Sequence, residues 1–486
     1  MAPRQLRERL VEAVGLDGIL DDPYDLLVYE YDASDEAVAG SHQPDFVVLP
    51  TTSQQVAEVV RIARDFNVPV TPRGAGTGLA GGAIAARGGI MVVLTRMTKI
   101  LELNYLDRYA IVEPGLINLD LSTKTTPDGY FFAPDPSSQK ACTIGGNVAN
   151  NSGGPHCLKY GVTSNHILGL EVVLPNGELI WVGGASPETP GVDLTGVLVG
   201  SEGTLGIVTK AMVRLTRNPE DVNVLMAPFP TIDSASGAVS AIIAAGILPA
   251  ALEMMDALTI QAVEAAFSAG YPLDAGAVLL IEIDGLAEAV AESTDEIVAI
   301  CKQHDAVDVR VATSKAERDL LWLGRKAAFG AMGRLTPNYY LQDTVVPRTM
   351  LPKTLNRVGE IARDYKLQIA NVFHAGDGNL HPLILFDRYK PGELERVLNA
   401  GTEMLHWCVD VGGAISGEHG IGLEKKDHLT MMYSPDDLAA MAGLKQSFDP
   451  LQYFNPDKIF PSGTGCGEID SLKEHAKWEK IGIHVV

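Results

Sequence analysis

The chain has 486 residues, which at a typical domain length of about 150 residues corresponds to roughly three domains or lobes. Hydrophobic residues make up 46%, charged residues 20% and aromatic residues 6%, and these values exclude a largely disordered or fibrous chain. Thirty-eight lysines and arginines oppose 61 aspartates and glutamates, so the net charge is −23. This charge excludes nucleic acid as an expected partner and disfavours binding to anionic lipid.

No signal sequence or membrane span is expected from the sequence. The N-terminus has no apolar core segment, and the longest apolar stretch, 238–252, is shorter than the ~18–20 residues of a span and is expected to be a buried helix and its exit. The cysteines contain no Cys-x-x-Cys pair, so neither a disulfide framework nor an iron–sulfur cluster held by this chain is expected. They are Cys142, Cys157, Cys301, Cys408 and Cys466. The sequence therefore predicts a cytoplasmic protein that reaches a membrane only through partner subunits.

The N-terminal half begins with a short helical lead-in and continues as a βαβ unit. The apolar run 46–50 predicts a strand, and a helix is expected from Thr52, where the hydroxyl can cap and Gln55 follows three positions later. A second strand is expected at 68–71. Further on, 168–182 reads as a hairpin with an Asn-Gly turn.

The sequence after about residue 220 predicts a second, α+β domain. Helices and strands alternate there at spacings typical of packed layers. The expected helices lie near 234–246, 256–268, 287–303 and 315–333, and the expected strands at 278–283 and 307–313.

A glycine-rich loop, Pro-Arg-Gly-Ala-Gly-Thr-Gly-Leu-Ala-Gly-Gly, occupies 72–82. Its Gly76-x-Gly78-x-x-Gly81 spacing matches the dinucleotide fingerprint, but only five residues separate it from the next glycine pair and the apolar strand 90–94. No helix of the Rossmann type fits in that space. Backbone N–H groups of such a loop can instead surround an anion, with Arg73 adding charge, although a tight turn is the simpler alternative.

A second block rich in glycine, asparagine and serine occupies 134–161, and a third glycine cluster occupies 200–208. The block at 134–161 is nearly uncharged, rich in amides and hydroxyls, and is expected to be a long loop without regular structure, which usually carries function. Its side chains could hydrogen-bond a large heteroaromatic cofactor and its hydroxyls, although each residue alone could be a turn former.

Two histidine-containing motifs suggest a metal site. His374-Ala-Gly-Asp-Gly-Asn-Leu-His381 lies between apolar strands, so its turn should bring both histidines to one end of a sheet. Glu418 in Ser-Gly-Glu-His-Gly adds a carboxylate, and two imidazoles with one carboxylate suit zinc, manganese or iron(II). The neighbouring His419 remains as a base. The alternative is that these are ordinary core or surface histidines.

In combination, the glycine loops resemble the FAD domain of the vanillyl-alcohol-oxidase-type flavoproteins. The second domain resembles the C-terminal domain of the 2-hydroxy-acid branch, which includes bacterial glycolate oxidase flavin subunits, D-lactate dehydrogenases and D-2-hydroxyglutarate dehydrogenases. The matching segments are 72–78, 143–149, 159–161 and 200–206. The resemblance implies an α+β fold, with a two-subdomain FAD-binding domain and an α+β, ferredoxin-like cap domain.

The resemblance also implies the domain limits and the residues that bind FAD. The limits are 1–45 for the lead-in, 46–218 for the FAD-binding domain, 219–454 for the cap domain and 455–486 for a segment returning to the FAD domain. Non-covalent FAD is expected because the loop 73–82 has no histidine, with Cys142 and Cys157 left as possible anchors. The implied FAD-binding residues are Arg73, Gly74, Ala75, Gly76, Thr77, Gly78, Pro136, Ser137, Thr143, Gly146, Asn147, Asn150, Ser152, Gly153, Gly161, Glu202, Gly206, Ile207 and Asn455.

For the chemistry, the resemblance implies that a divalent metal binds at His374, His381 and Glu418 and that His419 is the catalytic base. Arg325 matches the arginine that binds the substrate carboxylate. Arg348 is a weaker second candidate, for which a solvated salt bridge is an equal alternative. The expected reaction removes the hydroxyl proton to the base and the α-hydride to flavin N5.

Three positions favour a small substrate, glycolate or D-lactate. Leu383, Phe329 and the pair Tyr339-Tyr340 stand where members that oxidise hydroxyglutarate carry polar groups. A pocket without those groups would leave a second carboxylate buried and unpaired. One methyl group contributes only ~1–3 kcal/mol of discrimination, so glycolate and D-lactate are not distinguished.

The resemblance further implies partner subunits, a second flavin-domain subunit and an iron–sulfur subunit that accepts the electrons. The alternatives are a D-2-hydroxyglutarate dehydrogenase, a non-catalytic electron-transfer flavin subunit of such a complex, a metal hydrolase and a non-redox flavin synthase. A metal hydrolase, unlike a flavoprotein, would be colourless and would lose its activity with a chelator.

Overall fold

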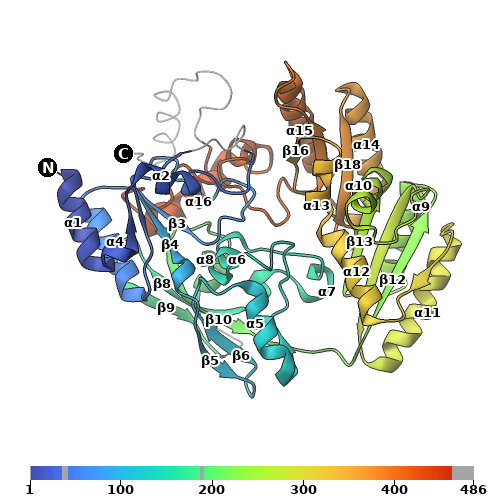
Figure 1. Ribbon diagram of the computed structural model, residues 1–486, viewed down its shortest axis with the longest axis horizontal. Coiled ribbons are helices and arrows are strands. Elements are labelled where there is room, and N and C mark those ends of the chain that lie inside the picture. The colour runs from blue at the N-terminus through green and yellow to red at the C-terminus, as the bar shows by residue number, and fades with distance from the viewer. Residues whose placement is uncertain (1, 36–41, 187–190, 462–486) are drawn as a thin grey trace. The chain divides into compact units, whose positions relative to one another are not determined.

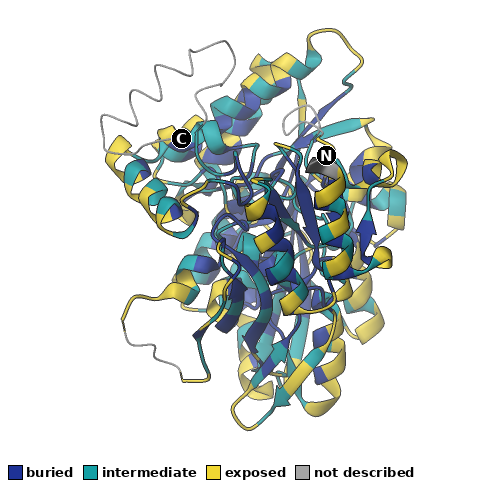
Figure 2. Cartoon of the chain, turned by 90° about the vertical axis from the view of Figure 1, so that its left-hand side faces the viewer, coloured by how far each residue is buried: buried dark blue, intermediate teal, exposed yellow. Residues whose placement is uncertain are grey.

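The computed structural model describes residues 2–35, 42–186 and 191–461, and the chain divides into two compact units (Figure 1). The first comprises Met1–Ser152, Val162–Asn218 and Glu418–Val486, and the second Gly153–Gly161 and Pro219–Gly417. Cys466 and most of the predicted C-terminal segment lie outside the described residues. Buried residues concentrate on the strands, whereas the helices alternate between buried and exposed positions (Figure 2).

The first unit begins with a mostly parallel sheet covered by helices. Strands β2, β4 and β3 run parallel, and β1 pairs antiparallel with β2, so the lead-in adds a strand that the sequence did not predict. The Thr52 hydroxyl accepts a hydrogen bond from the Gln55 N–H at 3.2 Å and caps the predicted helix. The elements are α1 (Ala2–Val14), β1 (Ile19–Leu20), α2 (Pro23–Leu26), β2 (Phe46–Val48), α4 (Ser53–Asp65), β3 (Val70–Arg73) and β4 (Ile90–Val93).

A second sheet of the same unit is antiparallel, in the order β5-β6-β10-β8-β9. Its β8–β9 pair is the predicted Asn-Gly hairpin. Helix α4 packs between the two sheets, because its buried face shares a core with Val173 and Ile207 as well as with the first sheet. The elements are β5 (Ile100–Asn104), β6 (Tyr109–Val112), α5 (Asn118–Thr125), β7 (Tyr130–Phe131), α6 (Ile144–Asn150), β8 (Ile167–Val173), β9 (Leu179–Gly183), α8 (Leu194–Leu198), β10 (Ile207–Arg214), β11 (Thr216–Arg217) and α16 (Pro435–Phe448).

The expectation of an unstructured loop at 134–161 is wrong, because this segment contains the helices α6 and α7 (Cys157–Tyr160). The Thr143 hydroxyl accepts a hydrogen bond from the Gly146 N–H at 3.2 Å and so caps α6. A Cβ at Gly145 would lie 2.7 Å from the Cβ of Pro114. The glycines of this segment therefore permit close packing of a helix and do not indicate a flexible loop.

The second unit is built on an antiparallel sheet in the order β15-β12-β14-β13-β18-β19-β17, with β16 and β20 pairing beside β18. Its strands are β12 (Asp221–Phe229), β13 (Ala251–Asp256), β14 (Ala277–Gly285), β15 (Arg310–Val311), β16 (Asn338–Leu341), β17 (Thr344–Val345), β18 (Gln368–His374), β19 (Asn379–Leu380) and β20 (Pro382–Phe386). Its helices are α9 (Ile232–Ala244), α10 (Ala257–Phe267), α11 (Ala287–Gln303), α12 (Lys315–Lys326), α13 (Ala328–Ala331), α14 (Leu351–Asp364) and α15 (Glu393–Asp410), with α7 joined to them.

Helices cover both faces of this sheet, and successive residues of a strand enter different cores. Leu225 packs with α9, α11 and α14, whereas its neighbours Val224 and Met226 pack with α10, α12 and α13. In Figure 1, α9 and α11 lie on one side of β12, and α12 and α13 on the other. The sequence of a strand that is covered on both faces is a continuous apolar run, without the alternation of apolar and polar residues seen in half-buried strands.

The buried helix and its exit expected at 238–252 are present, but the strand that follows them was not predicted. Helix α9 ends at Ala244, before Gly246 and Pro249, and the chain then enters β13 in the middle of the sheet. Every residue of β13 is buried. The helix predicted at 287–303 is present as α11 with the same bounds.

The two compact units differ from the predicted domain ranges in two places. Residues 153–161 join the second unit, where Lys159 pairs with Asp284 and His156 Nε2 lies 3.0 Å from Glu282 Oε1. The segment from Glu418 joins the first unit, where the Glu202 carboxylate accepts hydrogen bonds from two of its N–H groups. Among the described helices, none has both the length and the apolar character required to cross a bilayer.

Candidate functional site

The glycine loop after β3 has the features of an anion-binding turn. Gly76 adopts a φ of +72°, which an L side chain rarely adopts. Within the part of the chain that the structure describes, the N–H groups of residues 75–78 donate no hydrogen bond. Arg73 is buried next to this turn, and burial lowers the pKa of its guanidinium, opposed by Asp32. These unused donors and the buried cation fit the phosphate groups of a dinucleotide such as FAD.

The first unit brings the other predicted FAD segments to this loop. A Cβ at Gly74 would lie 2.5 Å from Thr143 Oγ1, so the glycine loop and the N-terminus of α6 touch. The Glu202 N–H donates to the Ala149 carbonyl at 2.9 Å. Asn455 Nδ2 donates to the carbonyls of Gly82 and Glu202 at 2.9 and 2.7 Å. Loops far apart in the sequence therefore converge within this unit.

Several of the predicted FAD ligands use their side chains to join these loops. Asn147 Oδ1 accepts from Asn118 Nδ2 at 2.9 Å, and Asn150 Nδ2 donates to the His419 carbonyl at 2.9 Å. Ser152 contributes its carbonyl, which accepts from the Thr163 N–H and hydroxyl at 3.1 and 2.7 Å. These contacts hold the converging loops together. A direct contact of each side chain with FAD remains a prediction.

The remaining predicted FAD positions are divided between the units. Gly153 and Gly161 belong to the second unit, as does Cys157. Cys142 is buried, and burial raises the pKa of its thiol despite the hydrogen bond from Asn147 Nδ2 at 3.4 Å. A thiol held in its neutral form is a poor nucleophile, which favours non-covalent FAD. The positions that belong to the first unit are Arg73, Gly74, Ala75, Gly76, Thr77, Gly78, Pro136, Ser137, Thr143, Gly146, Asn147, Asn150, Ser152, Glu202, Gly206, Ile207 and Asn455.

Glu202 should give the protein a measurable pH dependence of stability. Burial raises its pKa from 4.5 to about 6, although the N–H groups of Ile421 and Gly422 donate to the carboxylate at 2.7 and 2.8 Å. Between pH 4.5 and 6 the folded protein therefore holds more protons than the unfolded chain. The free energy of unfolding should then fall by about 2 kcal/mol as the pH rises through this window. Urea unfolding followed at several pH values would measure this fall.

The matched variant for this measurement is Glu202→Gln, which cannot ionise. Its stability relative to the native protein should improve by about the same 2 kcal/mol between pH 4.5 and 7. A constant difference between the two proteins across that range would contradict the assignment of the pH dependence to Glu202.

In the second unit, the hairpin after β18 brings the two predicted histidines together. His374 is the last residue of β18 and pairs with Asn379 of β19, and His381 follows β19 directly. Their ring centroids lie 5.1 Å apart in a T-shaped arrangement, and both residues are buried. The prediction that this turn places both imidazoles at one end of a sheet is confirmed.

A buried carboxylate that the sequence analysis missed lies next to His374. Glu253 of β13 is opposite His374 of β18 in the strand pairing, and its two oxygens lie 2.8 and 2.9 Å from His374 Nδ1. Burial opposes ionisation, but Arg325 and His374 outweigh it and hold the pKa of Glu253 below its usual range. Because the Glu253 carboxylate contacts Nδ1 of His374, this ring would bind a metal through Nε2.

Arg325 lies in the same cluster, fully buried near the end of α12. Its Nη2 forms an ion pair with Glu253 Oε2. Among the residues that the structure describes, Nε and Nη1 have no hydrogen-bond partner. A guanidinium buried with unused donors costs free energy unless another acceptor reaches it, and a substrate carboxylate is such an acceptor.

Two further residues lie against His381. Phe329 meets its ring edge-on, with centroids 5.9 Å apart. Asp343 Oδ1 lies 3.8 Å from His381 Nδ1, and Asp343 Oδ2 accepts from the Ser416 hydroxyl and the Gly417 N–H, both at 2.8 Å. Phe329 is therefore close enough to the histidines to restrict what binds there. Leu383, in contrast, is part of the core that covers the sheet.

Glu418 and His419 belong to the first unit, in the segment that Glu202 and Asn150 hold. His419 Nε2 lies 4.0 Å from Glu418 Oε1. The predicted metal set therefore takes its two histidines from one unit and its carboxylate from the other. Its assembly remains a prediction.

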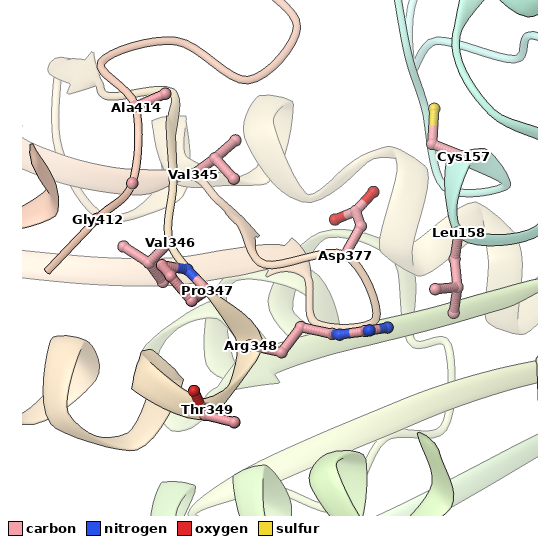
Figure 3. Close-up of a pocket in the computed structure, with 11 residues that line it drawn as sticks. Cys157, Leu158, Val345, Val346, Pro347, Arg348, Thr349, Asp377, Gly412 and Ala414 are labelled. Carbon is pink, nitrogen blue, oxygen red and sulfur yellow. The ribbon is translucent and has the colours of Figure 1, made fainter. Parts of the chain in front are cut away.

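Arg348, the second candidate for binding a carboxylate, lines a cavity of about 720 Å³ in the second unit (Figure 3). It is exposed, and its Nη1 donates to the Gly376 carbonyl at 3.3 Å. In Figure 3 its side chain extends along the cavity toward Leu158, with Asp377 and Cys157 also at the wall. Unlike Arg325, this arginine is not part of the buried cluster around Glu253.

The sequence matches two described domain families. Residues 44–183 match the family "FAD binding domain", and residues 218–459 match "FAD linked oxidases, C-terminal domain". The first match confirms the prediction of FAD as cofactor.

Curated relatives and solved structures agree with these matches. Glycolate oxidase subunit GlcD of Escherichia coli (strain K12) is 44% identical over 94% of this chain and 91% of that protein. A D-lactate dehydrogenase of Archaeoglobus fulgidus is 34% identical over 89% of this chain and 95% of that protein. The structure of p-cresol methylhydroxylase with substrate bound aligns with a TM-score of 0.80 at 18% identity, over 94% of this chain and 96% of that chain, and this likeness confirms the predicted fold. The chain therefore belongs to the family of FAD-linked oxidases that includes the glycolate oxidase subunits and D-lactate dehydrogenases.

Proposed function

We propose that this protein oxidises a small 2-hydroxy acid, glycolate or D-lactate, to the corresponding 2-oxo acid with FAD as the oxidant. The observation that carries the proposal is the buried cluster of Arg325, His374 and His381, in which a guanidinium with unused donors lies beside two imidazoles. The names of the relatives, a glycolate oxidase subunit and D-lactate dehydrogenases, support the same substrate class.

FAD supplies the two-electron oxidant, because its N5 accepts the α-hydride of the substrate. The residues of the chain bind, orient and deprotonate that substrate. Arg325 is proposed to hold the substrate carboxylate through those of its N–H groups that do not face Glu253. His419 is proposed to take the hydroxyl proton, since an imidazole can do so near neutral pH.

We also propose that His374, His381 and Glu418 hold a divalent metal, zinc, manganese or iron. Two imidazoles and a carboxylate suit all three ions, and the contact of Glu253 with His374 Nδ1 is the carboxylate–histidine pairing typical of metal ligands. A metal bound there would lower the pKa of the substrate hydroxyl.

The surroundings of His381 support a small substrate. Phe329 packs against the His381 ring in a T-shaped arrangement and offers no polar group there. A second carboxylate would be buried without a partner against such a side chain. D-2-hydroxyglutarate is the alternative substrate, and it requires a further cation close to this cluster.

We further propose that the chain works with partner subunits, a second flavin-domain subunit and an iron–sulfur subunit that accepts the electrons. The GlcD relative is itself named as a subunit of glycolate oxidase. A full physiological rate of quinone reduction by the isolated chain would contradict this arrangement.

The test of the proposed function is the anaerobic visible spectrum of the purified protein before and after addition of glycolate, D-lactate or D-2-hydroxyglutarate. Loss of the flavin bands at about 370 and 450 nm is expected with glycolate or D-lactate. Fastest bleaching by D-2-hydroxyglutarate would overturn the proposed substrate size. A yellow protein that no hydroxy acid bleaches would favour a non-catalytic flavin subunit or a non-redox synthase.

A further inference from the structure

The carboxylate of Glu253 has two partners with different proposed tasks. Its oxygens lie 2.8 and 2.9 Å from Nδ1 of His374, a proposed metal ligand. Oxygen Oε2 also pairs with Nη2 of Arg325, the proposed substrate-binding cation. All three side chains are buried, and Glu253 and Arg325 have no exposed surface. A single carboxylate thus joins two functional groups that come from β18 and α12.

Stability alone is a poor reason for an ionised carboxylate at this place. The neighbours Leu252, Met254 and Met255 on β13 are apolar and fully packed. A buried ion pair usually contributes no more to stability than apolar side chains of similar volume, because removing charges from water is costly. The arrangement instead resembles the outer carboxylates that fix the tautomer and orientation of metal-binding histidines.

We propose that Glu253 is a positioning residue that acts on both sides of the reaction centre, an inference that rests on the proposed function. By accepting a hydrogen bond from the Nδ1–H of His374, it fixes the ring and directs Nε2 to the metal. By pairing with Nη2 of Arg325, it orients the guanidinium so that the remaining N–H groups reach the substrate carboxylate. Loss of this one carboxylate should therefore weaken two separate binding events.

The test uses Glu253→Gln, which keeps the shape of the side chain and removes its charge, and Glu253→Asp, which keeps the charge on a shorter side chain. Asp256→Asn is the matched control. Asp256 is a buried carboxylate on the same strand, but it bonds the N–H groups of Thr259 and Asn371 and contacts neither histidine. Each full-length holoprotein is measured for binding of Mn²⁺ and Zn²⁺ after chelation, for KM and kcat with glycolate and D-lactate, and for thermal midpoint.

Glu253→Gln is expected to lower metal affinity by about 10- to 100-fold. The KM of this variant should rise at least about tenfold, because the substrate carboxylate meets a misplaced guanidinium. Glu253→Asp should recover part of both losses. Asp256→Asn should lower the thermal midpoint while leaving metal affinity and KM within about twofold of the native values.

Native metal affinity and KM in Glu253→Gln, even with a lower thermal midpoint, would overturn the inference and leave Glu253 a purely structural residue. If Glu253→Gln does not fold, Glu253→Asp decides the question by the same two measurements. The native protein tests the proposed function separately. Native protein that binds no divalent metal, or that is not reduced by any 2-hydroxy acid, would contradict the function itself.

Discussion

Replacing His419 by glutamine is expected to lower the rate of flavin reduction by a 2-hydroxy acid by about 10²- to 10⁴-fold, the usual contribution of a general base. Glutamine retains a polar side chain of similar length but does not accept a proton near neutral pH. The fold around it should persist, because the contact of residue 419 with Asn150 Nδ2 is made by the backbone carbonyl. Anaerobic stopped-flow reduction of the flavin at saturating substrate measures this rate directly.

The matched control is His406→Gln, at an exposed histidine of α15 that the proposed reaction does not use. Its rate of flavin reduction should equal the native rate. The pH profile gives a second readout, since the acidic limb that reports the base should be lost in His419→Gln alone. A rate within about fivefold of native protein would remove His419 from the role of base, because it lies below the range expected for that role.

The parts of the fold that the sequence predicted are those in which local chemistry decides the structure. Thr52 caps α4 with a hydrogen bond to the N–H three residues later, and no distant partner is needed for that. The hairpin of β8 and β9 and the turn between His374 and His381 follow equally from short-range turn preferences. The FAD loops and the pair of histidines could therefore be predicted before the fold was known.

The parts that were missed depend on contacts between distant residues. β13 is buried on both faces, so it shows no alternation that would separate it from the end of helix α9. The helix α6 was hidden by glycines, of which Gly145 is required for packing against Pro114. In both cases the local composition suggested one structure, and tertiary packing determined another.

Glu253 shows why part of the site could not be read from the sequence. It lies 121 residues before His374, and only the pairing of β13 with β18 makes the two neighbours. The one available signal was a charged residue inside the apolar run Ala250 to Met255, which calls for a buried partner. That signal indicates that a partner exists and does not say which residue it is.

Replacing Arg325 by methionine is expected to destabilise the protein by about 3–5 kcal/mol, because Glu253 would keep a buried charge without its cation. The same change should abolish measurable saturation by the substrate, since the unused donors Nε and Nη1 are removed with the charge. Urea unfolding followed by circular dichroism measures the first effect. Anaerobic flavin reduction measures the second.

A double-mutant cycle separates the two roles of Arg325. The variant Arg325→Met with Glu253→Gln has neither charge, so it should be more stable than Arg325→Met alone, while its reaction with the hydroxy acid stays impaired. Arg318→Met, on the same helix, removes a cation that pairs with the Val222 carbonyl and should leave the flavin reaction unchanged. Recovery of stability without recovery of activity would show that the lost activity of Arg325→Met does not follow from its lower stability. Recovery of both would mean that the guanidinium itself is not required by the reaction, and another cation would then have to bind the carboxylate.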